Sequence, residues 1–174
     1  MAVPFDRVHA IRAGDRLPVG DRTLLAVPPP LYDSPLSIGL LDEATGSFFS
    51  VDSFGALLPE ATEDAAQVPH DALAGGMLAW ALADSPWAHL VDRQRFGQVL
   101  EGVRRLQPAH IFSSHLPAAS GTSLERFLEV MESVPDAEPA VAPNHEEFGY
   151  MLAAMTAPPA APQVVGAEGG GPTR

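Results

Sequence analysis

The chain has 174 residues with 22 acidic and 10 basic side chains, so its formal net charge is −12, and every basic residue is an arginine. This excess of negative charge repels phosphate groups, which argues against nucleic acids and anionic membrane surfaces as partners. The chain has no cysteine. Disulfides, thiolate nucleophiles and cysteine-bound zinc are therefore excluded, and any metal site must use histidine and carboxylate ligands.

No apolar run approaches the roughly 20 residues of a membrane-spanning helix. Residues 1–10 also lack the basic-then-apolar order of a signal peptide. We therefore expect a cytoplasmic protein that makes no contact with a membrane. A length of 174 residues suits a single domain.

The N-terminal part of the chain predicts two strands. Residues 7–11 predict the first strand, which ends before a turn at Gly14 and Asp15. Residues 21–27 predict the second strand, which runs into three consecutive prolines at 28–30. The strand ends there, because proline has no N–H to donate to a neighbouring strand.

A β-hairpin is predicted next. The short apolar runs 37–42 and 47–51 flank a four-residue turn at 43–46, which is typical of two antiparallel strands. Asp52 stands at the end of the second strand of this hairpin.

Helices dominate the rest of the chain. Residues 70–83 are apolar on most sides, which is typical of a packed helix, although two adjacent glycines weaken it. Asp92 can cap a helix that ends before Pro108, because apolar residues recur there at spacings of three and four. A short buried strand over 109–113 follows and ends just before His115.

Two capping boxes predict the last helices. Thr122 with Glu125, and Asn144 with Glu147, have the spacing at which two side chains cap a first helical turn. Residues 157–174 consist largely of Ala, Pro and Gly. We expect this tail to be disordered, because it has too few large apolar side chains to offset its ordering entropy.

These elements predict an α/β fold over residues 1–156, in which helices pack against a mixed sheet. Charge is unevenly distributed within it, since residues 23–92 hold ten acidic side chains and no arginine. Such a stretch is either a solvated acidic face or a cation site, and a cation site needs specific ligands.

Three residues could supply those ligands, because a sheet fixes the loops that follow its strands. Asp33 lies in the loop after the prolines, Asp52 follows the hairpin, and His115 follows the 109–113 strand. Two carboxylates and one imidazole suit iron, zinc or manganese. Each residue also has an ordinary structural interpretation, since aspartate often forms turns or caps at strand ends.

Four segments carry motifs in a defined order. They read GDRL with LLAV at residues 14–17 and 24–27, DSP at 33–35, FFSVDSFG at 48–55 and SSHLP at 113–117. In this order they resemble the metallo-β-lactamase fold, and within it the oxygen-binding diiron branch found in flavodiiron proteins. The segment 48–55 is the most specific, because it is similar to the flavodiiron pattern LFS-x-D-x-FG, whose aspartate bridges two metals.

The resemblance implies a partial αββα sandwich with a metal site, in which Asp52 is the bridging ligand and Asp33 and His115 are terminal ligands. It implies iron or zinc as the metal, with either hydrolysis by metal-activated water or oxygen-type redox chemistry. We expect no flavin domain in this chain, so any electron donor would be a separate protein.

The sequence departs from the family in its principal ligands. In the family these lie in a His-x-His-x-Asp-His or His-x-Glu-x-Asp motif in the first half of the domain, and this sequence contains neither. Asp33 replaces the usual histidine, and Leu116 replaces a common glycine. We therefore expect an incomplete site, at which at least one metal is weakly bound or absent.

Four aromatic residues near these ligands have less defined roles. Tyr32 could hydrogen-bond to a ligand, and His89 could help to roof a pocket, although packing or surface roles are the simpler interpretation of both. Trp80 and Trp87 are expected to anchor the core or an interface.

Three hypotheses of function follow. The first is a metal-dependent hydrolase or diiron-type oxidoreductase with an incomplete site. The second is a non-catalytic scaffold that self-associates or binds a partner protein, through the sheet face and edge that the missing half would cover. In the third, Met1 is not the true start, and the missing ligands are encoded upstream.

Overall fold

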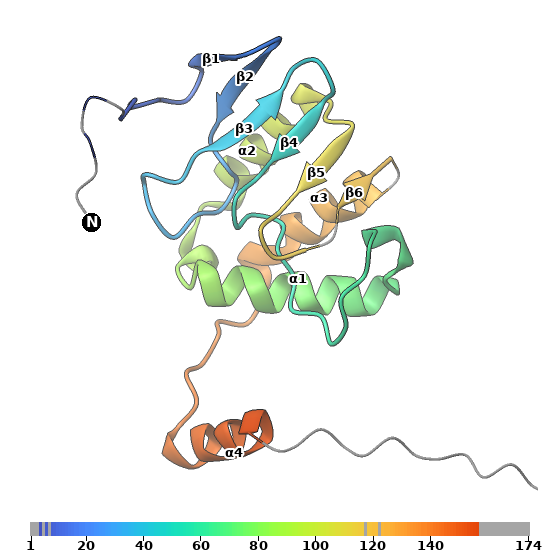
Figure 1. Ribbon diagram of the computed structural model, residues 1–174. Coiled ribbons are helices and arrows are strands. Elements are labelled where there is room, and N and C mark those ends of the chain that lie inside the picture. Colours follow the sequence, from blue (N-terminus) through green and yellow to red (C-terminus); the bar gives the residue numbers. More distant parts are fainter. Residues whose placement is uncertain (1–3, 5, 7, 117, 122, 157–174) are drawn as a thin grey trace, which may run out of the picture. The chain divides into compact units, whose positions relative to one another are not determined.

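The computed structural model describes residues 4, 6, 8–116, 118–121 and 123–156 (Figure 1). Its strands are β1 (Arg16–Val19), β2 (Arg22–Val27), β3 (Gly39–Asp42), β4 (Ser47–Phe49), β5 (His110–Phe112) and β6 (Ala119–Ser120). Its α-helices are α1 (His70–Asp84), α2 (Arg93–Leu106), α3 (Ser123–Ser133) and α4 (His145–Thr156). Short 3-10 helices are η2 (Ala65–Gln67), η3 (Ala88–Leu90) and η4 (Val134–Asp136). The predicted α/β class is confirmed.

The six strands form one mixed sheet in chain order, from β1 to β6. Neighbouring strands are antiparallel except β4 and β5, which pair in parallel. A parallel pair needs a crossover connection, and here the crossover contains α1 and α2. The predicted mixed sheet and the hairpin of β3 and β4 are confirmed, whereas the sequence pattern does not indicate the two-residue strand β6.

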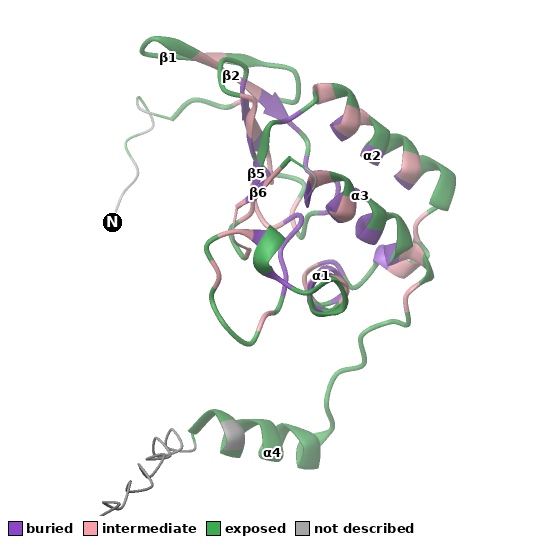
Figure 2. Cartoon of the chain, turned by 90° about the vertical axis from the view of Figure 1, so that its right-hand side faces the viewer, coloured by how far each residue is buried: buried purple, intermediate pink, exposed green. Residues whose placement is uncertain are grey.

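Helices α1, α2 and α3 cover one face of this sheet (Figures 1 and 2). Side chains alternate between the two faces of a strand, and Phe48 and Ile111 are buried in the core. Their neighbours Phe49 and Phe112 lie on the other face, where their rings stack with centroids 5.3 Å apart. Phe49 is 46% exposed. The described residues of Met1–Ala140 therefore form one helical layer and one sheet layer, and no second layer covers the other sheet face among them.

The first hairpin differs from the sequence prediction. The strand predicted over residues 7–11 is wrong, because its described residues 8–11 are not in a strand, and β2 pairs instead with β1. A two-residue loop that begins with Gly20 joins these strands, and Gly20 has a φ of +64°, which glycine adopts without strain. Pro18 is accepted in β1 because β1 is an edge strand of the sheet.

Helix α1 lies in close backbone contact with the loop that follows the β3–β4 hairpin. The Leu57 amide donates a hydrogen bond of 3.0 Å to the Gly76 carbonyl. A Cβ atom on Gly76 would meet the Leu57 carbonyl oxygen at 2.5 Å, whereas a Cβ atom on Gly75 would meet nothing within 4 Å. Of the two glycines that weaken this helix, Gly76 is therefore the one that close packing requires.

Helix α2 begins and ends as its sequence predicts. The Asp92 side chain accepts a hydrogen bond of 2.8 Å from the Arg95 amide and thereby caps the first turn. The helix ends at Leu106, and Gln107 takes a left-handed conformation before Pro108. The buried residues of the helix are Phe96, Leu100 and Val103.

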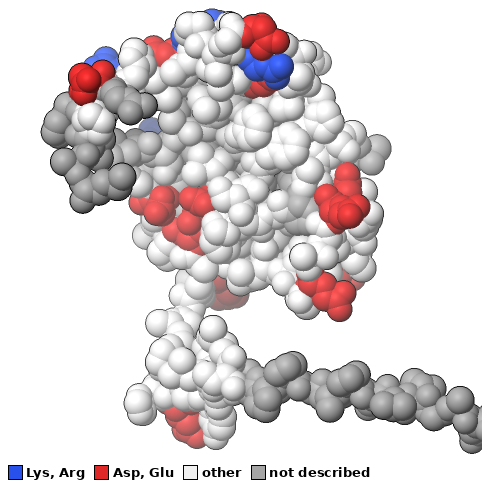
Figure 3. All heavy atoms as spheres, in the orientation of Figure 1, with Lys and Arg blue, Asp and Glu red and all other residues white. Residues whose placement is uncertain are grey.

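The acidic stretch over residues 23–92 is mostly a solvated surface. Glu43, Glu60, Glu63 and Asp71 are exposed. Figure 3 shows separate acidic groups spread over one face of the molecule, whereas basic side chains on this face gather near the end that holds β1 and β2. The interpretation as a solvated face therefore holds for most of the stretch, and the acidic residues that are not fully exposed are Asp42, Asp52, Asp64 and Asp84.

The chain forms two compact units, Met1–Ala140 and Val141–Arg174. The second unit contains α4, whose predicted capping box is confirmed. The Asn144 side chain accepts a hydrogen bond of 3.0 Å from the Glu147 amide, and the Glu147 carboxylate accepts one of 2.8 Å from the Asn144 amide. The predicted domain boundary at residue 156 stays a prediction.

Two predictions concern residues outside the described part of the chain. These residues are Thr122, in the first capping box, and the tail 157–174. Helix α3 itself is found, from Ser123 to Ser133. Within the described ranges, no helix is both long and apolar enough to cross a membrane.

Candidate functional site

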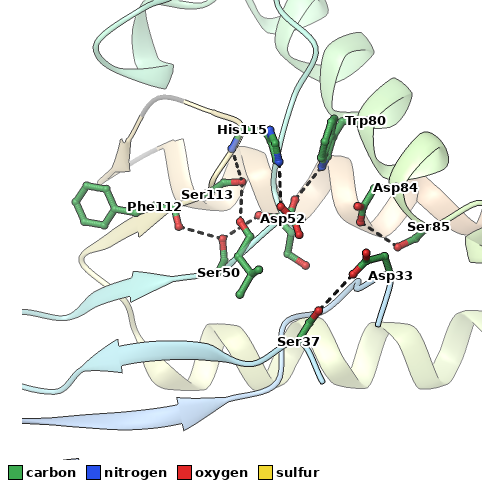
Figure 4. A network of polar contacts seen from close by, with 12 residues as sticks. Asp33, Ser37, Ser50, Asp52, Trp80, Asp84, Ser85, Phe112, Ser113 and His115 are labelled. Carbon is green, nitrogen blue, oxygen red and sulfur yellow. Dashed lines mark hydrogen bonds and ion pairs between the residues drawn. The ribbon is translucent and has the colours of Figure 1, made fainter. Parts of the chain in front are cut away.

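Asp52 and His115 lie side by side at one end of the sheet, because the strands that precede them, β4 and β5, run in parallel (Figure 4). The His115 Nε2 atom is 3.0 Å from the Asp52 Oδ1 atom, and the two form an ion pair when the imidazole is protonated. Both side chains remain accessible to solvent, at 43% exposure for His115 and 26% for Asp52. The sequence predicts both residues at strand ends, and the structure brings them together.

Backbone hydrogen bonds join the two loops that carry this pair. The Ser114 amide donates to the Val51 carbonyl over 2.8 Å, and the Ser50 amide donates to the Phe112 carbonyl over 2.9 Å. Val51 has a φ of +56°, a left-handed conformation that is strained for a β-branched residue. The chain thus takes an unfavourable turn directly before Asp52, and the paired loops hold it there.

The indole of Trp80, on α1, packs against the pair from the helical side. Its Nε1–H donates a hydrogen bond of 2.9 Å to the Asp52 backbone carbonyl. Its ring centroid lies 4.0 Å from that of His115. Gly55 provides the space for this ring, because a Cβ atom there would meet the indole Nε1 at 2.5 Å. The sequence pattern, which indicates an anchor of the core or of an interface, does not reveal this contact.

Asp84 is a further carboxylate at this end of the sheet that the sequence reasoning did not select. Burial raises the pKa of Asp84, and the negative charges of Asp52 and Asp33 raise it further. A hydrogen bond of 3.3 Å from the Ser85 hydroxyl opposes this shift to a smaller extent. Asp84 comes four residues after Trp80, a spacing that places both on one face of a helix. This spacing is the signal that could have pointed to both.

Asp33 lies on the loop after β2, and in Figure 4 it is drawn next to Asp84. Its carboxylate accepts a hydrogen bond of 3.3 Å from the Ser37 hydroxyl, and its charge contributes to the raised pKa of Asp84. In the described part of the chain, no hydrogen bond or ion pair joins Asp33 to Asp52 or His115. The structure therefore places two of the three predicted ligands in contact and the third in the surrounding charge field.

Of the two predicted accessory residues, Tyr32 lies in the loop between β2 and β3, and His89 lies in the segment between α1 and α2. Tyr32 packs against Trp87, with ring centroids 5.9 Å apart. His89 lies in η3, and its Nδ1 atom is buried without a hydrogen-bond partner among the residues that the structure describes. Packing is the role that the structure shows for Tyr32. A role of either residue beside a metal stays a prediction.

A cavity of about 410 Å³ opens beside His115. Its lining includes Glu60 and Thr62, and the Thr62 hydroxyl is buried with no hydrogen-bond partner among the described residues. Apolar side chains such as Leu58 and Leu116 complete the wall. A small ligand can therefore approach the imidazole from this side.

The donor types at this end of the sheet fit iron, but their arrangement does not complete a two-iron centre. Carboxylates and imidazole are ligands that iron accepts. Among the described residues, however, no group of three or more His, Asp or Glu side chains is arranged to hold a metal ion. The His115 imidazole is also engaged by Asp52, so an ion bound between them would have to separate the two side chains. The described residues thus supply ligand types that iron accepts, without a complete metal site among them.

The sequence matches no protein-family model and no curated protein. The structure, in contrast, is similar to solved structures of diiron proteins. Rubredoxin oxygen:oxidoreductase from Desulfovibrio gigas matches with a TM-score of 0.61 and 18% identity over 75% of this chain. The flavodiiron protein from Giardia intestinalis matches with a TM-score of 0.60 and 18% identity over 72%. A peroxy diiron species of the chemotaxis sensor ODP matches with a TM-score of 0.57 and 17% identity over 80%.

These similarities establish the fold. The chain has the metallo-β-lactamase-like fold of flavodiiron proteins, in agreement with the sequence motifs. It spans 32% of the rubredoxin oxygen:oxidoreductase chain, 30% of the flavodiiron chain and 54% of the ODP chain. It therefore corresponds to part of each of these proteins, which is consistent with a single sheet layer.

Proposed function

We propose that this chain is part of a diiron-type oxidoreductase and that Asp52, His115 and Asp33 supply part of its iron site. The observation that carries the proposal is the 3.0 Å contact between Asp52 and His115, at the ends of two parallel strands. The fold supports it, because it is shared with proteins whose names specify diiron centres. An oxidoreductase is favoured over a hydrolase, and iron over zinc, because the similar structures are an oxygen:oxidoreductase and diiron proteins.

The chain's own residues prepare this site for a cation. The Trp80 indole holds the Asp52 backbone and packs on the His115 ring, which limits the rotation of both. Asp84 adds negative charge, and a bound cation would favour its ionised form, opposite to the effect of its carboxylate neighbours. Iron would supply the redox chemistry, and a separate redox protein would supply the electrons.

The bare sheet face supports a further part of the proposal, which concerns the source of the remaining ligands. Leu40, Phe49 and Phe112 stand in register across β3, β4 and β5, and a cavity of about 320 Å³ lies along them. Apolar sheet faces of this kind are normally covered. We propose that a partner protein, or a further part of the same protein, forms the second layer and contributes the missing ligands.

The same face supports a second candidate function, a non-catalytic scaffold that binds a partner through the sheet. The exposed Phe49 ring is the observation that favours it. The two functions differ in one measurable property, because a scaffold needs no affinity for iron.

Anaerobic titration of the purified full chain with ferrous iron, followed by calorimetry, separates the two functions. We expect one weakly bound ion per chain, because the Asp52–His115 contact must open and few ligands converge. Asp52→Asn should weaken this binding at least about tenfold. Asp71→Asn removes an exposed carboxylate in the first turn of α1 and should bind iron as the wild type does.

Two outcomes of this titration contradict the proposal. Equal, near-zero binding by the wild type and by Asp52→Asn would leave only the scaffold. Two tightly bound ions per chain would show that the site is complete. A fluorescent dye for apolar surfaces tests the bare face independently, since the wild type should bind it and Phe49→Ser should bind less.

A further inference from the structure

A long apolar groove runs beside α2 on the Met1–Ala140 unit. It consists of two adjoining cavities of about 350 and 440 Å³, which share Pro28 and Val99 in their lining. Val99 is 43% exposed, so the groove is open to solvent. One wall is α2, and the other is formed by β2 and the triple proline. The apolar residues that matter most here are Val27, Pro28, Trp87, Val99, Val103 and Leu106.

Helix α4, in the second unit, carries an exposed apolar stripe. Phe148, Met151, Leu152 and Met155 stand at positions i, i+3, i+4 and i+7, and their exposures range from 46% to 80%. This spacing is the pattern of a helix that docks its apolar face into a groove. The capping box at Asn144 stabilises the helix before it docks.

We propose that α4 of one copy of this chain docks into the α2 groove of a second copy, and that the exchange is reciprocal. The lengths agree, because the 14 residues of α2 span about 21 Å and the 12 residues of α4 span about 18 Å. A reciprocal exchange has two-fold symmetry and uses the contact twice. It thereby doubles the buried area, toward the about 1,000 Å² that a specific interface needs.

Charge complementarity supports this occupant. Arg95 lines the groove together with one carboxylate, that of Asp92, and the Arg105 guanidinium lies 4.0 Å from the position of a Cβ on Gly102, another groove residue. Helix α4 has Glu146 and Glu147 in its first turn. Two arginines thus stand against one aspartate along the groove, and in a chain with 22 acidic and 10 basic residues this excess of positive charge is a favourable place for an acidic helix end.

Sedimentation velocity of the full chain over a range of concentrations tests the proposal. We expect a monomer–dimer equilibrium. Leu152→Glu in the stripe and Val99→Glu in the groove should each weaken the dimer at least about tenfold, because each would bury an unpaired charge. Ala153→Glu, on the opposite face of α4, and Val19→Glu, in an edge strand, are the matched controls and should leave the dimer unchanged.

Mixing the two disruptive variants distinguishes exchange between copies from docking within one copy. A Leu152→Glu chain keeps an intact groove, and a Val99→Glu chain keeps an intact α4. An equimolar mixture should therefore form heterodimers through one of the two contacts, although each variant alone is monomeric. Because Leu152 lies outside the Met1–Ala140 unit, its effect cannot arise from unfolding of the groove.

Three results would overturn the proposal. The first is a wild-type chain that stays monomeric at all concentrations. The second is a dimer that persists in both disruptive variants. The third is a dimer that Phe49→Glu disrupts while Val99→Glu does not, since that result would place the interface on the bare sheet face.

Discussion

The two ends of the sheet hold aspartates in opposite surroundings. At the turn between β3 and β4, Asp42 is 4% exposed. Its carboxylate accepts hydrogen bonds from the Ala44 amide, the Thr45 hydroxyl and the Arg22 guanidinium. Burial by itself raises the pKa of Asp42, but these three partners outweigh burial and the pKa is lowered. The folded chain thus supplies hydrogen-bond donors and a positive charge to this carboxylate.

At the other end of the sheet, the carboxylates have few hydrogen-bond donors and lie close to one another. Asp84 receives one hydrogen bond, from Ser85, and its pKa is raised by burial and by the neighbouring Asp52 and Asp33. Asp52 contacts an imidazole that is itself exposed. Burial is therefore a poor guide to function here, since the most buried aspartate has a structural role. The incompletely partnered carboxylates are the ones that a cation could satisfy.

Among variants at the end of the sheet that carries Asp52 and His115, Gly76→Ala should cause the largest loss of stability. It places a Cβ against the Leu57 backbone oxygen. Backbone cannot yield as a side chain does, so we expect a loss of roughly 1–3 kcal/mol in the free energy of unfolding. Gly75→Ala is the matched control, and in open space it should gain about 0.5–1 kcal/mol. Chemical denaturation measures both, and equal effects at the two positions would contradict the packing described for α1.

A smaller effect is expected from Gly55→Ala, which displaces the Trp80 indole from its place. The hydrogen bond to the Asp52 carbonyl and the contact with His115 would be lost, at a cost of about 1–2 kcal/mol. The tryptophan emission spectrum should shift, because the ring changes its surroundings. Trp80→Phe should lower stability without a clash, and an unchanged emission spectrum in Gly55→Ala would refute the contact.

At the end of the sheet that carries Asp42, the contribution of this carboxylate to stability should depend on pH. The folded pKa of Asp42 is lowered, so its stabilisation is complete above the unfolded pKa of about 3.9 and is lost as the pH falls through the folded value. Asp42→Asn should therefore be less stable than the wild type at pH 7, by less than the Gly76 variant. This deficit should shrink toward pH 3 in denaturation experiments. A deficit that is the same at both pH values would contradict the role of charge.

The smallest change in stability is expected from Asp84→Asn, which should stabilise the protein rather than destabilise it. The folded pKa of Asp84 is raised, so its ionised form disfavours folding above that pKa, and this penalty is absent below the unfolded pKa. Asp84→Asn should gain less than about 1 kcal/mol at pH 7, because solvent screens this partly exposed group. The gain should diminish toward pH 4 and in high salt. Destabilisation that does not vary with pH would show that Asp84 has a packing role.

The sequence predicts those elements whose signals are local. The hairpin around residues 43–46 and the helix capped by Asp92 are confirmed because turn residues and a capping side chain act within a few positions. The prediction of a strand over residues 7–11 is wrong, and the reason is also a local signal. The two-residue turn at Gly20 is a stronger hairpin signal than the turn at Gly14.

The candidate site depends on contacts between distant segments, so the sequence predicts it only in part. The sequence points to Asp52 and His115 because they follow strands and match motifs, but their contact depends on the parallel pairing of β4 and β5. Trp80 and Asp84 come from a helix without a motif, and only the packing of α1 brings them there. The orientation of α1 against the sheet is not encoded in any short segment.

The parallel pairing has a consequence for how the protein folds. Val51 and Ser113, which share a hydrogen bond across the paired loops, are 62 residues apart in the sequence. Closing a segment of that length is entropically unfavourable, and contacts of this kind form late in folding. A chain that has formed its hairpins but has not yet paired β5 with β4 contains secondary structure but lacks the contact between Asp52 and His115. Local opening of β5 in the mature protein would likewise separate His115 from Asp52 while the β3–β4 turn stays intact.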